Sequence, residues 1–514
     1  MAAKRPTFEE VSRIAEGFRM KLSPEQARTF HNFIQARMRT YDRLDELVEP
    51  SLEVKYPDRR NWRPAEKENP FGAWYWRAEI KGAPDGPLAG KTLAVKDNVF
   101  VAGVPMMIGS RLIEGFVPNS DATIVTRILN AGGTILGKTV CENLCFSGNS
   151  HTSQSGVVRN PYDLSRSPGG SSTGSAALVA AGLVDLAIGT DQAGSIRIPG
   201  SWSGLCSLKP TYGLVPYTGI GPMEATLDHV GPIARTAADA ALLLEVIAGP
   251  DGLDPRQRAG IEAREYTAAL TGDVKGLRIG IVKEGFATPH HPHPEKDVDD
   301  AVRDAAHSLE KLGAKVGEIS LPMHLDGFHI WIGIAQEGML AFMVDGHAVG
   351  RNWKGYYPTD LVELFGRNVR QHGEELSVSG KARMIFARFL DQTYNGRYYA
   401  KAQNLARALA AAYDDAFRQF DILVMPTTPI KAAKIPSVDA PLEKQLMATG
   451  EMIPNTCPLN ATGHPALNVP CAMSEGLPVG MMFIGRMGED ATLLRAGDAF
   501  GRHIFTPPPP PSLA

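Results

Sequence analysis

The chain has 514 residues, of which 43% are hydrophobic and 21% are charged, so it can bury a large core as one domain or a few smaller ones. Its net charge of −3 gives no broad basic field, which argues against nucleic acid or an anionic membrane as a partner and favours a small, nearly neutral substrate. Five scattered cysteines, an odd number, argue against a disulfide framework and predict reduced thiols in the cytoplasm.

The first part of the chain predicts helices. Its N-terminal sequence is charged throughout and lacks the apolar core of a signal peptide, and no uninterrupted apolar run is long enough to span a bilayer. Apolar residues recur at helical spacing over 7–17 and 24–48, and Ser23 before Pro24 forms a cap and first-turn pair. We predict a helical N-terminal region over residues 1–68, followed by an aromatic-rich linker around residues 61–80.

Strands and helices then alternate along the chain. The expected strands are 91–96, 134–138, 184–190, 277–282, 421–427 and 476–485, and the expected helices are 121–131, 171–182, 297–313 and 490–503. Such alternation predicts an α/β fold with a mixed central sheet covered by helices on both faces. We expect this domain to span residues 69–505, with a helical subdomain inserted at about 323–418 and a Pro-rich tail over 506–514.

Two glycine-flanked serines are the most informative local feature. Ser171 follows two glycines and Ser195 follows one, and a small-residue helix and an apolar strand lie between them. Glycine opens backbone conformations that other residues avoid and leaves room for a substrate, but serine alone is a weak nucleophile that needs a base. Lys96 ends the apolar strand LAVK, at the sheet edge where α/β proteins place their sites. A buried lysine loses its charge readily, and the neutral amine can act as a general base.

Three other patterns could mark a functional site, but the sequence favours them less than the two serines and Lys96. The segment GGTILGKT at 132–139 satisfies the P-loop pattern, but a helix precedes it and its apolar residues suit a buried strand. The three histidines of HHPHP at 290–294 are separated by prolines, which predicts a solvated loop and no metal site. A Ser-His-Asp triad using His151, His229 or His464 stays open, although none lies near a nucleophile elbow.

The segments KDN, GGSSTGS, GTDQAGSIRIP and LKPTYGLVP together closely resemble the signature of the amidase signature family of serine hydrolases. The two serines are 24 positions apart, as is usual in that family, and the similarity runs from about residue 68 to GHPALNVP and GLPVGMM near the C-terminus. The helical N-terminal region and the length resemble bacterial amidases associated with nitrile metabolism. Those enzymes hydrolyse aliphatic and aromatic carboxamides, sometimes enantioselectively.

The resemblance implies a role for each motif residue. Ser195 would be the acyl-forming nucleophile, Ser171 a bridging serine with a cis peptide bond to its neighbour, and Lys96 the base, which gives a Ser-cisSer-Lys triad. Supporting residues would be Asp191 and Arg197, which brace the loop, and Ser172, although Arg197 could also meet an acidic substrate. The implied oxyanion hole consists of the backbone amides of Gln192, Ala193, Gly194 and Ser195.

Two positions depart from the family pattern, because Thr173 and Ala193 stand where glycine is usual. Alanine does not freely adopt a positive φ, so either the loop does not require one or the oxyanion hole is reshaped. The segments that would line the acyl pocket contain Phe146, Gln192, Trp202 and Ile453. Packing in the core is the alternative interpretation of these four.

The implied activity is hydrolysis of carboxamides to a carboxylic acid and ammonia or an amine, through an acyl-enzyme and without a metal or organic cofactor. The alternatives are the amidase subunit of a tRNA-dependent amidotransferase, a hydrolase of related esters, anilides or carbamates, and a binding module without catalysis. We further expect a cytoplasmic homodimer, assembled through the amphipathic N-terminal helices.

Overall fold

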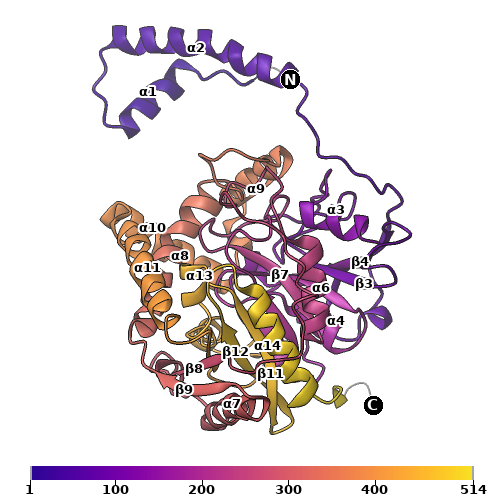
Figure 1. Cartoon of the computed structure of the whole chain (residues 1–514). Coiled ribbons are helices and arrows are strands. Elements are labelled where there is room, and N and C mark those ends of the chain that lie inside the picture. The colour runs from indigo at the N-terminus through magenta and orange to yellow at the C-terminus, as the bar shows by residue number, and fades with distance from the viewer. Residues whose placement is uncertain (1–2, 512–514) are drawn as a thin grey trace. The chain divides into compact units, whose positions relative to one another are not determined.

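The computed structural model describes residues 3–511, which divide into two compact units (Figure 1). The first unit extends to Glu53 and the second begins at Val54. Residues 512–514, the end of the predicted Pro-rich tail, lie outside the described residues. The first unit contains helices, and the second contains the sheet and the serine motifs.

The first unit is a pair of helices, α1 (Phe8–Gly17) and α2 (Pro24–Glu46). The predicted start of α2 is confirmed, because the Ser23 side chain accepts a hydrogen bond from the Gln26 amide and the Gln26 side chain bonds back to Ser23. Buried Val11 and Ala15 of α1 and Ala27 of α2 lie where the two helices meet. The pair is thus a small helical hairpin.

The second unit is built on one large mixed sheet. Within residues 3–511 the sheet has twelve strands, in the order β1-β2-β4-β3-β5-β7-β6-β11-β12-β10-β8-β9. The strand bounds are β1 Arg60–Trp62, β2 Trp74–Lys81, β3 Thr92–Lys96, β4 Thr134–Thr139, β5 Leu186–Asp191, β6 Cys206–Lys209, β7 His229–Ala234, β8 Arg278–Val282, β9 Lys315–Ile319, β10 Ile422–Pro426, β11 Ala466–Ser474 and β12 Leu477–Ile484. The predicted α/β fold with a mixed sheet is therefore confirmed.

The centre of the sheet positions the motif residues. Strand β3 pairs in parallel with both β4 and β5, so the ends of β3 and β5 meet at one edge. Every residue of β5 is buried, as expected for an apolar strand covered on both faces. The short helix α4 (Thr173–Ala180), buried throughout, packs against β3 and β5. Lys96 at the end of β3 and the loop after β5 are thereby brought together.

Helices surround this sheet (Figure 1). Their bounds are α3 Thr123–Asn130, α5 Arg197–Trp202, α6 Ala237–Ile247, α7 Lys296–Ser308, α12 Leu442–Met447, α13 Pro458–Thr462 and α14 Asp490–His503. Helix α6 packs on β7, and α7 packs on β10, β11 and β12. These contacts cover the apolar strands that form the core.

Between β9 and β10 the chain is helical. This segment contains α8 (Met323–Met339), α9 (Thr359–Gln371), α10 (Val378–Tyr394) and α11 (Arg397–Ala416). Together with the π-helical turn that follows it, α8 is long and apolar enough to cross a membrane, but 61% of its most apolar window is buried inside the protein. It packs against α10 and α11, as a core helix does.

Some elements differ from the prediction. Residues 61–80, interpreted as a linker, instead form most of β1 and β2 at one edge of the sheet, where the Trp76 indole donates to Asn61. Aromatic residues favour strands, so the Trp-rich composition was a strand signal. The segment 132–139 contains strand β4 and no phosphate loop, which confirms the strand interpretation.

Candidate active site

Lys96 is fully buried at the end of β3. Its Nζ atom lies 2.7 Å from Ser171 Oγ, 2.8 Å from Thr190 Oγ1 and 3.4 Å from the Thr190 carbonyl oxygen. Within residues 3–511 no carboxylate lies within ion-pair distance of this amine. The amine is therefore held by two hydroxyl groups and a carbonyl, and Thr190 is a contact that the sequence reasoning missed.

A second buried lysine lies close by but is already paired. Lys138 Nζ lies 3.2 Å from Asp97 Oδ1, and Asp97 Oδ2 accepts the backbone N–H groups of Met107 and Ile108 at 2.9 and 2.7 Å. Burial lowers the pKa of Lys138 and raises that of Asp97, and the charge of each partner opposes the shift of the other. The lysine of the P-loop-like pattern is thus bound to Asp97, and Lys96 is the one that reaches a serine.

The backbone around Ser171 has the form that the resemblance implied, since the Gly170–Ser171 peptide bond is cis. Gly170 donates its N–H to the Gly148 carbonyl at 2.7 Å, and a Cβ at Gly170 would lie 2.3 Å from the Asn149 carbonyl oxygen. No larger residue fits at this position. The glycine therefore lets the chain pass close to the 148–149 segment.

The next two residues anchor helix α4. The Ser172 hydroxyl donates to the Thr190 carbonyl at 3.3 Å, and the Thr173 hydroxyl donates to the Val140 carbonyl at 3.0 Å. Both side chains are fully buried. Thr173, one of the two predicted departures from the family pattern, thus adds a hydrogen bond between α4 and the residue that follows β4.

Asp191 and Arg197 form a buried ion pair beneath the loop after β5. Arg197 donates through Nε and a terminal nitrogen to both carboxylate oxygens, at 3.1 and 3.0 Å, and neither side chain is exposed. Burial alone would raise the pKa of Asp191, but Arg197 and Asn460 hold it well below its usual range. Because Arg197 also donates to Thr456 and Asn460, it braces the loop and does not reach a substrate.

The loop itself presents three free amides. Gly194 has a φ of +134° and donates its N–H to Asp191 Oδ1 at 2.7 Å, so this predicted oxyanion donor is already engaged. The N–H groups of Gln192, Ala193 and Ser195 make no hydrogen bond within residues 3–511. Ala193 does not have a positive φ. The loop therefore accommodates alanine without strain.

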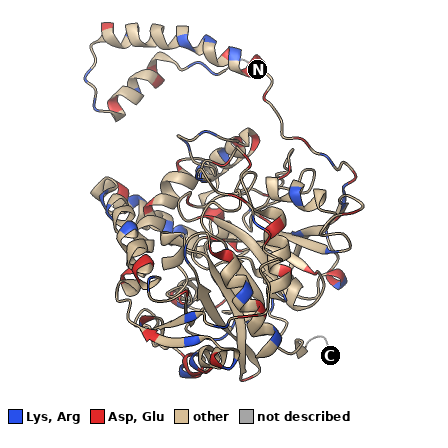
Figure 2. Cartoon of the chain, viewed as in Figure 1, with Lys and Arg blue, Asp and Glu red and all other residues tan. Residues whose placement is uncertain are grey.

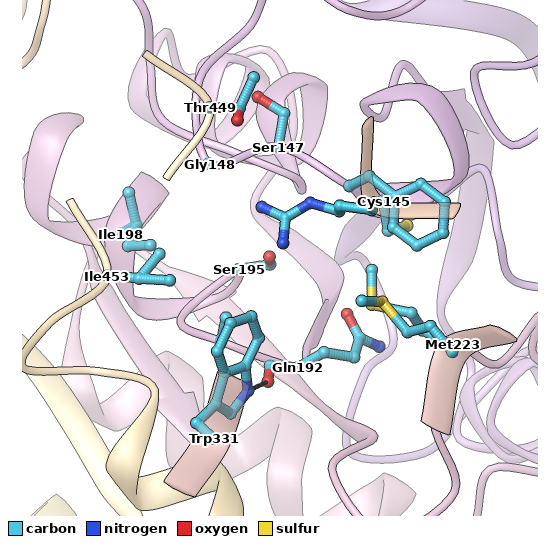
Figure 3. A pocket seen from close by; sticks show the side chains of 14 residues that line it. Cys145, Ser147, Gly148, Gln192, Ser195, Ile198, Met223, Trp331, Thr449 and Ile453 are labelled. Atoms are coloured by element: carbon cyan, nitrogen blue, oxygen red, sulfur yellow. Dashed lines mark hydrogen bonds between the residues drawn. The ribbon is translucent and has the colours of Figure 1, made fainter. Parts of the chain in front are cut away.

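Ser195 is one of the residues that line a pocket (Figure 3). Of the predicted pocket residues, Phe146, Gln192 and Ile453 line it. Trp202 does not, because it is fully buried in the core and its indole donates to the Ile430 carbonyl at 3.1 Å. The further lining residues, which sequence reasoning missed, are Cys145, Ser147, Gly148, Ile198, Met223, Trp331, Met339, Arg383 and Thr449.

Trp331 of α8 connects the helical segment to the loop. Its indole N–H donates to the Gln192 carbonyl at 2.7 Å, and Figure 3 shows the ring directed toward Gln192 beside Ser195. Nothing local in the sequence marks this residue, because α8 and the loop are more than a hundred positions apart. The contact exists only once the chain is folded.

The five cysteines are buried free thiols, and one of them lies at the site. A hydrogen bond with Cys141 lowers the pKa of Cys145, and a hydrogen bond with Ser171 acts in the same direction. Cys145 also lines the pocket. A polarised thiol therefore lies next to the lysine and the first serine.

The alternative site interpretations find no support in the geometry. His151, His229 and His464 make contacts with Gln445, Leu227 and Asp414, and in residues 3–511 none of the three bonds to Ser171 or Ser195. No group of His, Cys, Asp and Glu among the described residues is arranged to hold a metal ion. The fold instead brings Lys96 and Ser171 into hydrogen-bond contact.

Comparisons with known proteins show the family of this chain. The family model described as Amidase matches residues 72–494. An enantioselective amidase from Rhodococcus rhodochrous is 46% identical over 513 residues, which cover 99% of this chain and 98% of the relative. A glutamyl-tRNA(Gln) amidotransferase subunit from Methanosarcina mazei is 38% identical, and the match covers 83% of this chain and 88% of that relative.

Among solved structures, the peptide amidase from Stenotrophomonas maltophilia superimposes with a TM-score of 0.69 at 32% identity, and the match covers 83% of this chain and 85% of the peptide amidase. The fold is thus shared with an enzyme whose name describes cleavage of amides.

Proposed function

Because this chain belongs to the amidase signature family and is an amide hydrolase, we propose that Ser195 attacks the carbonyl carbon of a carboxamide and forms an acyl-enzyme. The observation that carries the proposal is the 2.7 Å hydrogen bond between Lys96 Nζ and Ser171 Oγ, at the edge of the sheet where Ser195 opens into the pocket. The products are a carboxylic acid and ammonia or an amine.

The proposed proton relay runs from Ser195 through Ser171 to Lys96. As Ser195 Oγ bonds to the substrate carbon, its proton passes to Ser171 Oγ, and the proton of Ser171 passes to Lys96 Nζ. The relay then reverses and protonates the leaving nitrogen, so the C–N bond breaks and ammonia leaves. In the second half of the reaction, water attacks the ester bond of the acyl-enzyme and gives its proton to the same relay. The acid leaves and Ser195 is restored.

The negative charge on the substrate oxygen is stabilised by the amides of Gln192, Ala193 and Ser195, which have no other partner within residues 3–511. The Gly194 N–H, which the resemblance placed in the oxyanion hole, does not belong to it, because this N–H donates to Asp191. The bracing of Asp191 by Arg197 supports a rigid loop, and donors fixed in advance are the ones that accelerate such reactions.

Two other activities remain as alternatives. One is that of the amidase subunit of a tRNA-dependent amidotransferase, since curated relatives carry the name of that enzyme. Two observations favour the free amidase: the Rhodococcus amidase matches the N-terminal helices as well, and Lys and Arg are interspersed with Asp and Glu in both units (Figure 2). The other is hydrolysis of esters, anilides or carbamates, which proceeds through the same acyl-enzyme.

We also propose a cytoplasmic homodimer. All five cysteines are unpaired and buried, as in proteins of reducing compartments. Helix α1 leaves apolar side chains of α2 uncovered, including Phe33 and Leu44. Light scattering tests the dimer, and a monomer at working concentration contradicts it.

The decisive experiment labels the purified chain with a fluorophosphonate and locates the adduct by mass spectrometry. We expect the adduct on Ser195, ammonia release from simple carboxamides by the chain alone, and loss of both in Ser195→Ala with unchanged melting. An adduct elsewhere contradicts the mechanism. Ammonia release that begins only when a tRNA-binding partner protein is added supports the amidotransferase alternative.

A further inference from the structure

Arg383 is the one charged side chain among the described residues that line the Ser195 pocket. It lies on α10, and its backbone carbonyl accepts a hydrogen bond from the Gln336 side chain of α8. A Cβ on Gly450 would lie 3.8 Å from a terminal nitrogen of Arg383, so the guanidinium end lies beside the 449–453 segment. That segment contributes Thr449 and Ile453 to the same pocket.

The guanidinium group has no counter-charge. Within residues 3–511 it makes neither a hydrogen bond nor an ion pair, and burial lowers the pKa of Arg383 with no nearby carboxylate to oppose the shift. Arg388, five residues further along the same helix, pairs with both Asp345 and Asp391. Arg383 is half-buried at the pocket wall, whereas the Arg388 side chain is 41% exposed, so Arg383 is the one of the two whose charge is partly removed from water without a protein partner.

The rest of the pocket cannot supply the missing partner. Its wall is mostly apolar, with Phe146, Met223, Trp331, Met339 and Ile453, and its remaining polar side chains are hydroxyls, a thiol and the Gln192 amide. No Asp or Glu lines it among the described residues. A ligand with both a carboxylate and an ammonium group would therefore leave its ammonium unpaired, whereas a purely anionic ligand would be matched.

We propose, on the basis of the function proposed above, that Arg383 binds a carboxylate on the acyl part of the substrate, so that monoamides of dicarboxylic acids are preferred. The amide end lies at Ser195, and the carboxylate end lies at the planar guanidinium group, which matches a carboxylate with two parallel hydrogen bonds. The apolar wall receives the carbon chain between the two ends. Arg197, the other arginine considered for an acidic substrate, is excluded by its pairing with Asp191.

The test compares each anionic amide with a neutral amide of the same chain length. Succinamate, glutaramate and adipamate are measured against butyramide, valeramide and hexanamide, and the readout is the ratio of kcat/KM within each pair. We expect at least one anionic member to exceed its partner by about 10- to 100-fold, the usual range for a hydrogen-bonded charge pair. The difference should reside mainly in KM, because the contact is made far from the reacting carbon.

The variants Arg383→Met and Arg383→Lys separate shape from charge. In Arg383→Met we expect the ratio to fall to about one or below, and in Arg383→Lys to be intermediate, because lysine keeps the charge but not the two-pronged geometry. Arg388→Met is the matched control on the same helix and should leave the ratio unchanged. Fluorophosphonate labelling of Ser195 in each variant shows that the site is folded.

Binding without turnover separates this proposal from the proposed function. Glutarate should stabilise the wild-type protein in a thermal-shift assay more than butyrate does, and Arg383→Met should abolish the difference. If no amide is hydrolysed but glutarate still binds through Arg383, the amidase mechanism fails and the carboxylate site stands. If the neutral amides are hydrolysed as well as the anionic ones and glutarate has no effect, the carboxylate site is wrong.

Discussion

Trp331 donates its indole N–H to the carbonyl oxygen of Gln192, and this carbonyl shares a peptide plane with the N–H of Ala193. The hydrogen bond of a pocket-wall residue therefore sets the direction of an amide that we assign to the oxyanion hole. In the proposed mechanism the inserted helical segment therefore acts on the chemistry indirectly, in addition to contributing residues to the pocket.

Replacement of this tryptophan should therefore slow the reaction. In Trp331→Phe the ring still fills the wall, but the Ala193 amide loses its orientation, and we expect kcat to fall by about 10-fold with a smaller change in KM. Steady-state kinetics measure the changes in kcat and in KM separately. Trp202→Phe removes a similar indole bond in the core, to Ile430, and should lower the melting temperature without this loss of kcat.

Thr190 should be needed because its hydroxyl accepts a hydrogen bond from Lys96 at 2.8 Å and another from Asn98 at 3.2 Å. Thr190→Val keeps the shape but leaves Lys96 with fewer partners, and we expect kcat/KM to fall by about 10- to 100-fold. Thr190→Ser keeps the hydroxyl and should recover most of the activity. Equal activity in the valine and serine variants would show that Thr190 does not orient the lysine.

Removal of the charge of Asp191 should destabilise the protein. Asp191→Asn leaves Arg197 buried without its partner, and we expect a loss of about 3–5 kcal/mol in the free energy of unfolding, measured in denaturant. The pKa of Asp191 is depressed in the folded state. Its contribution to the free energy of unfolding is therefore present above the pKa of the unfolded state and is lost as the pH falls toward the pKa of the folded state. The double variant Asp191→Asn with Arg197→Met should recover part of the loss, since no unpaired charge remains.

Glu142 should make stability fall as the pH rises. Burial raises its pKa to about 7, although its carboxylate accepts hydrogen bonds from the backbone N–H and hydroxyl of Thr152 at 2.9 and 2.6 Å. Glu142 therefore binds a proton more tightly in the folded state than in the unfolded state. Its contribution to the free energy of unfolding is full below about pH 4.5 and is lost as the pH rises through 7.

The measurement is the free energy of unfolding at pH 5 and at pH 8. Relative to Glu142→Gln, which has no charge to bury, the wild type should lose up to about 3 kcal/mol between these values. The exposed Glu363→Gln serves as the control and should follow the wild type. If the free energy of unfolding changed equally with pH in the wild type and in Glu142→Gln, Glu142 would not be the group responsible.

The sequence reasoning could nominate the residues of the proposed relay because they lie in short contiguous motifs. Lys96, Ser171 and Ser195 each stand beside a strand or glycine turn whose local pattern is clear, and parallel pairing of β3 with its neighbours brings those ends together. Trp202 shows the limit of this reasoning. It lies seven positions after Ser195, but helix α5 turns it into the core, where all residues of that helix are buried.

The unpredicted parts depend on long-range packing. Strand β6 has only four residues, and β7 and β11 contain proline, so their local signal is weak. Their pairing in the sheet makes them strands. Met223, Trp331 and Arg383 come from segments far from the serines, and no local pattern indicates that they meet at one pocket. Whether residue 193 needs a positive φ could not be read from the sequence, and the folded backbone shows that Ala193 does not have one.

The proposed relay occupies residues 96–195, whereas part of the pocket wall comes from residues 331–453. The first stretch thus contains the proposed reactive groups together with part of the pocket wall, whereas the second contributes to the wall alone. Mutational libraries confined to the second stretch should retune selectivity while leaving the reactive groups untouched, provided that Trp331 is kept, because it is the point where the two stretches are joined by a hydrogen bond.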